Sequence, residues 1–131
     1  MSASDRPRQQ TLGILLISAG HERAHYALVL ATGAAATGRD VVLFATNAGC
    51  LLFEASRPLE ADPREALLAQ RGVAGIGTLM AAAEDLGIRR IACEAGLKAE
   101  GIEAGTLRPG VEIAGVVTFL SAVGPGSIVS L

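Results

Sequence analysis

Short runs of branched apolar residues, each followed by a longer segment that suits a helix or loop, recur along this 131-residue chain. The clearest runs cover residues 11–18 (TLGILLIS), 39–46 (RDVVLFAT) and 88–93 (IRRIAC). Continuous apolar runs of this length are typical of strands buried on both faces of a parallel sheet. The alternation predicts an α/β fold with three layers, α/β/α, around a mostly parallel sheet of about five strands.

The segments between these runs predict the remaining elements. Glycines at positions 38 and 87 are expected to end two helices, and Asp62 before Pro63 is a helix start. Two prolines, Pro58 and Pro63, make a long regular element unfavourable over residues 47–65. A helix is expected over 75–87 with Thr78 as its cap, then a short helix or turn over 94–102 and a short extended piece near 112. The apolar segment over 115–124 suits a helix or a strand, with a helix favoured, and a closing strand is expected over 127–131.

Composition narrows the class of protein. Hydrophobic residues make up 50% and aromatic residues only 3%, so small aliphatic side chains must build the core, and some apolar surface is expected between subunits. A net charge of −2 without a basic stripe excludes recognition of a nucleic-acid backbone. No apolar run reaches the roughly 18–20 residues of a membrane span.

The ends and the cysteines add to this picture. Residues 1–10 lack the apolar segment of a signal peptide and are expected to form a flexible tail before a single domain over residues 11–131. Two cysteines, Cys50 and Cys93, are expected to be free thiols in a cytoplasmic protein rather than a disulfide.

Cys93 is the leading candidate for chemistry. It ends the third apolar run, and in open parallel sheets function gathers at the carboxyl ends of the strands. A following helix would favour the thiolate, whereas the neighbouring Glu94 would oppose it. The alternative is a cysteine packed in the core, and position alone leaves both open. By the same edge rule, His21, Asn47, Cys50 and Glu94 are candidates to line the site.

The histidines His21 and His25 lie in HERAH, which matches the spacing of the zinc-protease motif. The match falls at the start of a helix in a small α/β chain with no evident third ligand, so we expect no metal there and keep a metal-dependent hydrolase only as a minor alternative. The glycines of residues 72–80 (GVAGIGTLM) lack a preceding strand and the phosphate-binding lysine, which favours close helix packing over nucleotide binding. No cofactor is expected.

Three segments together resemble the DsrE/DsrF-like family of small sulfur-handling proteins, and more narrowly its branch often labelled peroxiredoxin-like. They are ALVLATGAAATGRDVVLFAT, LMAAAEDLGIRRIAC and GVEIAGVVTFL. The resemblance implies one α/β/α domain that assembles as a homo-trimer or hexamer. It also implies sulfur relay, in which Cys93 accepts sulfane sulfur as a persulfide from a donor and passes it to an acceptor, either of them a protein or a small thiol. A non-catalytic oligomeric binding or scaffold subunit, with Cys93 buried, is the alternative of another class.

Overall fold

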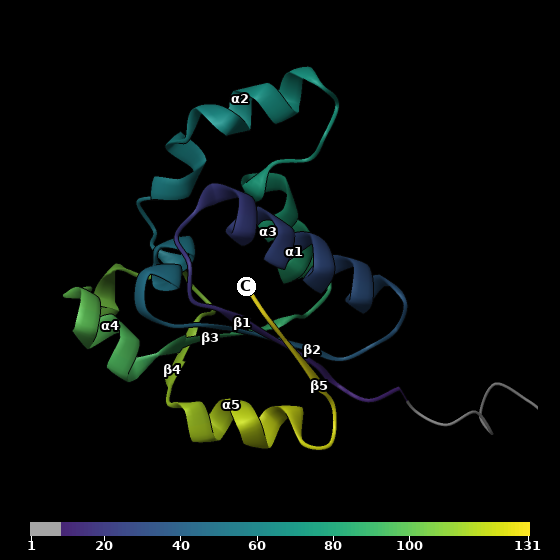
Figure 1. Cartoon of the computed structure of the whole chain (residues 1–131), viewed down its shortest axis with the longest axis vertical. Coiled ribbons are helices and arrows are strands. Elements are labelled where there is room, and N and C mark those ends of the chain that lie inside the picture. Colours follow the sequence, from purple (N-terminus) through teal and green to yellow (C-terminus); the bar gives the residue numbers. More distant parts are fainter. Residues whose placement is uncertain (1–8) are drawn as a thin grey trace, which may run out of the picture.

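The computed structural model describes residues 9–131, and its centre is one sheet of five strands (Figure 1). The strands are β1 Leu12–Leu16, β2 Val41–Ala45, β3 Arg89–Cys93, β4 Glu112–Ala114 and β5 Ser127–Ser130. They lie in the order β4-β3-β2-β1-β5, and every neighbouring pair is parallel. The predicted sheet of about five mostly parallel strands is therefore confirmed.

Helices cover both faces of this sheet, which confirms the α/β/α arrangement. The α-helices are α1 His21–Ala36, α2 Pro63–Gln70, α3 Ile76–Asp85, α4 Glu94–Glu100 and α5 Val116–Val123. Among residues 9–131 there are also three short 3-10 helices, η2 Asn47–Phe53, η3 Pro58–Ala61 and η4 Ala104–Thr106. Figure 1 shows α1 and α3 on one side of the sheet, α5 alone on the other, and α2 farthest out. The short helix α4 follows β3 at the carboxyl edge of the sheet.

Alternation along each strand divides the core in two, because successive side chains point to opposite faces of a sheet. Leu43 of β2 and Ala92 of β3 belong to the larger cluster beneath α1 and α3. Phe44, Ile91 and Cys93 belong to the smaller cluster beneath α5. Cys93 is therefore packed on the α5 side of the sheet.

Gly13 of β1 explains how closely α5 approaches the sheet. A Cβ atom at this position would collide with the side chain of Val123 and lie 3.0 Å from Cζ of Phe119. A residue without a side chain lets the helix lie directly on the strand. Phe119 then stacks on Phe44, with ring centroids 4.6 Å apart. One helix thus covers the centre of this side of the sheet.

Most predicted element boundaries are confirmed, and one is wrong. Gly38 and Gly87 have φ of +92° and +70° just after α1 and α3, as expected of glycines that end helices. The side chain of Asp62 accepts a hydrogen bond from the Arg64 N–H at 2.8 Å and caps α2. Thr78, however, lies inside α3, which begins at Ile76, because a distant side chain supplies the cap that the sequence pattern assigns to Thr78.

That side chain is Glu65 of α2, whose Oε1 accepts a hydrogen bond from the Ile76 N–H at 2.8 Å.

Of the other predictions, residues 94–102 begin with a true helix, α4, and residues 116–123 form a helix, as favoured. The predicted flexible tail falls mainly on residues 1–8, outside the described residues. Within residues 9–131, no helix combines the length and apolar character needed to cross a bilayer.

Candidate functional site at the carboxyl edge of the sheet

Cys93 is both the last residue of β3 and the N-cap of α4. A cap accepts a hydrogen bond from one of the first backbone N–H groups of its helix, and the usual cap atom is an oxygen. Here the sulfur performs that role: Sγ accepts a hydrogen bond from the Gly96 N–H at 3.4 Å. The Gly96 amide is therefore directed at the sulfur from the first turn of α4. The predicted position, a strand end followed by a helix, is confirmed.

The side chain of Cys93 is only 8% exposed. Its cluster contains the stacked rings of Phe44 and Phe119, together with Ile91 of its own strand. The core interpretation expects this apolar packing, whereas the reactive interpretation expects the hydrogen bond from Gly96. The two interpretations of the sequence, a reactive thiol and a core cysteine, therefore describe two real and opposed features of the same residue.

Cys50 lies in η2, directly after β2, and its side chain is fully buried. Its thiol donates a hydrogen bond to the carbonyl oxygen of Ala45 at 3.5 Å. Burial raises the pKa of the Cys50 thiol from 9.0 to about 11; the backbone N–H of Cys93 lowers it, and negative charge on Cys93 raises it. The two cysteines are therefore neighbours at one edge of the sheet, but Cys50 packs in the α1-side cluster and stays protonated at neutral pH.

Glu94 and Asn47 also lie at this edge, and both are exposed. The carboxylate of Glu94 faces Lys98 one turn later in α4, with Oε1 3.4 Å from Nζ. Asn47 has a φ of +50°, unusual for a residue other than glycine, and its Oδ1 accepts a hydrogen bond from the Thr46 hydroxyl at 2.9 Å. The carboxylate of Glu94 is therefore paired with the ammonium of Lys98 and is not an isolated negative charge next to Cys93 in the sequence.

His21 is placed differently from what its position after β1 predicts. Its Nε2 lies 2.9 Å from Oε2 of Glu65, and Nε2 of His25 lies 2.8 Å from the carbonyl oxygen of Ala74. The two imidazole rings stack with centroids 5.8 Å apart. Both histidines therefore fasten the segment from α2 to α3 onto α1, on the side of the sheet away from Cys93.

The HERAH motif is thus used for packing. The two Nε2 atoms face different partners, a carboxylate and a backbone carbonyl, rather than one shared point. Among the described residues no three His, Cys, Asp or Glu side chains are gathered in a way that could hold a metal ion. The residues that are present do not fit the zinc site that the motif would require.

The model of the DsrE/DsrF-like family matches residues 11–127, which include strands β1 to β4 and the first residue of β5. The chain belongs to the DsrE/DsrF-like family. No curated protein matches it.

Solved structures share the DsrE/DsrF-like fold. YchN from E. coli has a TM-score of 0.72 at 18% identity, covering 94% of this chain and 100% of that one. A protein of unknown function, MTH1491 from Methanobacterium thermoautotrophicum, has a TM-score of 0.58 at 16% identity with the same coverage. BT1422 from Bacteroides thetaiotaomicron, also of unknown function, has a TM-score of 0.54 at 17% identity, covering 93% of this chain and 95% of that one. At these identities the likeness is one of fold.

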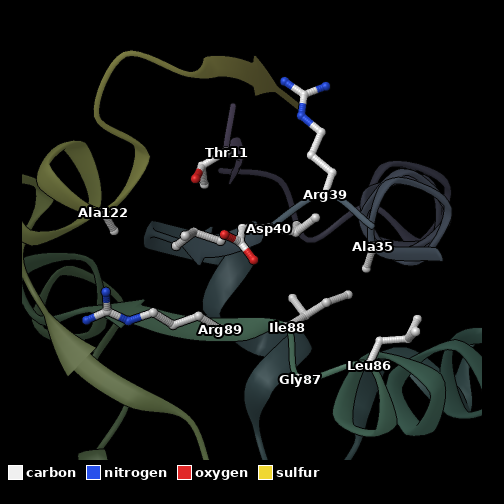
Figure 2. Close-up of a pocket in the computed structure, with 11 residues that line it drawn as sticks. Thr11, Ala35, Arg39, Asp40, Leu86, Gly87, Ile88, Arg89 and Ala122 are labelled. Atoms are coloured by element: carbon white, nitrogen blue, oxygen red, sulfur yellow. The ribbon is translucent and has the colours of Figure 1, made fainter. Parts of the chain in front are cut away.

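A second feature of this DsrE/DsrF-like chain is a cavity of about 270 Å³ at the opposite edge of the sheet (Figure 2). Asp40 extends into its centre, and the guanidinium of Arg89 lies at one side. Arg89 pairs with Glu112 at 2.8 Å, and Arg39 donates to the carbonyl oxygen of Gln10 at 2.6 Å. The cavity lies at the amino ends of the strands, away from Cys93, so it is not part of the candidate site.

The glycines before α3 do not form a phosphate site in this family member. The N-terminus of α3, where an anion would bind, is taken by the carboxylate of Glu65. A Cβ atom at Gly75 would lie 2.8 Å from Oε2 of the same Glu65. Close packing, the interpretation that the sequence favours, is confirmed.

Sequence reasoning missed one residue of the site, Gly96. It donates the hydrogen bond to Cys93 and is buried in the first turn of α4. The available signal was a glycine inside a predicted helix, where it costs about 1 kcal/mol relative to alanine and therefore calls for a packing reason.

Proposed function

We propose that this chain is a sulfur carrier that relays sulfane sulfur as a persulfide on Cys93. Membership of the DsrE/DsrF-like family supports a role in sulfur handling. The observation that carries the assignment to one residue is the hydrogen bond from the Gly96 N–H to Sγ of Cys93 at the carboxyl end of β3. The other thiol, Cys50, is a poor nucleophile at neutral pH because burial raises its pKa to about 11.

The relay consists of two thiol exchanges. The Cys93 thiolate attacks the outer sulfur of a donor persulfide, R–S–SH; the S–S bond of the donor breaks, and R–S⁻ leaves while Cys93–S–SH forms. An acceptor thiolate then attacks the outer sulfur of Cys93–S–SH, and the Cys93 thiolate leaves. The donor's sulfane sulfur ends on the acceptor without an external oxidant or reductant. Donor and acceptor are each a protein or a small thiol, in a reducing compartment such as the cytoplasm.

The protein that carries out this relay is proposed to be a homo-trimer or hexamer. The exposed face of α5 presents Val116, Val117 and Leu120, and Ile128 of the edge strand β5 is also exposed. A single helix covers this side of the sheet, whereas α1 and α3 cover the other (Figure 1). Apolar side chains gathered on one surface are typical of an interface.

A second candidate function rests on the burial of Cys93. At 8% exposure, packed with Phe44 and Phe119, the cysteine equally suits a non-catalytic oligomeric binding or scaffold subunit of the same fold. The two functions differ in thiol accessibility. A mild alkylating agent at neutral pH labels Cys93 rapidly in a sulfur carrier and slowly in a scaffold.

The decisive experiment is mass spectrometry after incubation with a small persulfide donor. The wild-type protein and Cys50→Ala are expected to gain one sulfur atom, and Cys93→Ala is expected to gain none. Peptide mapping should place the sulfur on Cys93. If the wild type gains nothing, or if Cys93→Ala gains as much as the wild type, the proposed relay is wrong.

A further inference from the structure

Gly96 lies against the end of β2 more closely than any other residue type could. A Cβ atom built on Gly96 would collide with the backbone nitrogen of Asn47 and lie 2.5 Å from Oγ1 and 3.0 Å from Cα of Thr46. Two of these three atoms belong to the backbone, so a side-chain rotation could not relieve the collision. The first turn of α4 is therefore fixed on the Thr46–Asn47 junction by backbone contact.

The same residue carries the N–H group that faces Cys93. Gly96 is the third residue of α4, the position whose amide a cap residue normally accepts from. Its N–H donates to Sγ of Cys93 at 3.4 Å. Because α4 has only seven residues, its own hydrogen bonds fix its direction weakly, and contacts with neighbouring segments must hold it.

Asn47 contributes the other half of the contact. Its φ of +50° turns the chain sharply as it leaves β2 and brings its backbone nitrogen next to Gly96. The Thr46 hydroxyl, which donates to Oδ1 of Asn47, lies on the same side. The end of β2 and the first turn of α4 thus meet through a glycine on one side and a left-handed residue on the other.

We propose that Gly96 is a positioning residue for Cys93: its contact with Thr46 and Asn47 keeps the Gly96 N–H on Sγ, where it stabilises the thiolate that attacks the donor and leaves toward the acceptor. The proposal rests on the proposed relay and names the residue that sets the reactivity of its sulfur. It also explains why α4 contains a glycine and why Asn47 has a left-handed conformation: both are needed for this contact.

The first test compares Gly96→Ala with Gly105→Ala, both in a Cys50→Ala background so that one thiol remains. A methyl group added at Gly105 would meet no atom within 4 Å, so this position is a matched control. Loss of a hydrogen bond to a charged group should lower the rate of Cys93 alkylation at pH 7 about tenfold in Gly96→Ala. The pH at which alkylation reaches half its maximal rate should rise. Gly105→Ala should leave both within about twofold of the background protein.

A purely structural role for Gly96 would lower the unfolding temperature without moving this pH profile, and that outcome would overturn the proposal. Circular dichroism establishes whether Gly96→Ala is folded. Should it not fold, the amide resonance of Gly96 in the Cys50→Ala protein provides the answer: its chemical shift should titrate at the pH at which Cys93 alkylation is half-maximal. A Gly96 amide that does not respond while Cys93 ionises overturns the proposal. Neither measurement involves a persulfide, so failure of the relay and failure of the positioning role remain distinguishable.

Discussion

The carboxylate of Glu65 holds two segments at once: Oε2 lies 2.9 Å from Nε2 of His21, and Oε1 accepts the Ile76 N–H at 2.8 Å. His21 is almost completely buried, and Glu65 is largely so. One acidic side chain of α2 therefore joins the start of α1 to the start of α3.

Removing this carboxylate should destabilise the protein. We expect Glu65→Ala to lower the free energy of unfolding by about 2–4 kcal/mol, because it leaves a buried imidazole and a helix N-terminus without their partner. Glu94→Ala removes an exposed ion pair with Lys98 and should cost no more than about 0.5 kcal/mol. Urea denaturation measures both; equal costs for the two variants would contradict this role of Glu65.

Cys50 should make stability depend on alkaline pH. Burial raises the pKa of its thiol from 9.0 to about 11, so the folded chain keeps a proton that the unfolded chain loses. The contribution of Cys50 to stability is therefore complete below pH 9 and is lost as the pH rises through about 11. The wild type should lose about 2 kcal/mol more than Cys50→Ala over this interval. Parallel pH profiles of unfolding free energy for the two proteins would contradict this role of the Cys50 thiol.

The proposed interface on α5 can be tested with a single charge. Val117 is 73% exposed on this helix, and Val73, between α2 and α3, is 45% exposed on another surface. We expect Val117→Lys to convert a trimer or hexamer into monomers in light-scattering measurements, because a lysine ammonium is costly to bury. Val73→Lys should keep the mass of the wild type. A monomeric wild type, or an unchanged mass for Val117→Lys, would show that copies do not associate through α5.

Two glycine-to-alanine substitutions should change stability in opposite directions. At Gly13 a methyl group would collide with Val123 and approach Phe119, so Gly13→Ala should cost about 1–3 kcal/mol. At Gly33, within α1, a methyl group meets no atom within 4 Å, so Gly33→Ala should stabilise the protein by about 0.5–1 kcal/mol. Thermal or urea unfolding measures the change in unfolding free energy for each variant. A Gly13→Ala protein as stable as the wild type would contradict the close approach of α5 to β1.

The features that can be predicted from the sequence are those set by neighbouring residues. The apolar runs of β1, β2 and β3 identify buried strands by themselves, and Gly38 and Gly87 end helices through their own backbone freedom. Cys93 can be placed because a strand end is a local feature, and the rule about carboxyl edges then applies.

The features that the sequence does not reveal depend on distant residues. The edge rule predicts His21 near the thiols, but Glu65, 44 positions away, holds its ring against α2. The local pattern predicts Thr78 as the cap of α3, but the same Glu65 binds the N–H of Ile76, and the helix begins there instead. The role of Gly96 depends on the conformation of Asn47, which no property of residues 94–100 indicates.

The topology also sets the order in which Cys93 acquires its surroundings. Strand β4 pairs with β3 at one edge of the sheet, α5 crosses beneath, and β5 pairs with β1 at the far edge. Phe119 and Val123, which complete the cluster around Cys93, therefore leave the ribosome after Phe44 and Ile91. Because Cys93 precedes Phe119 and Val123 in the chain, its apolar surroundings can close only after α5 has been synthesised and packed on the sheet.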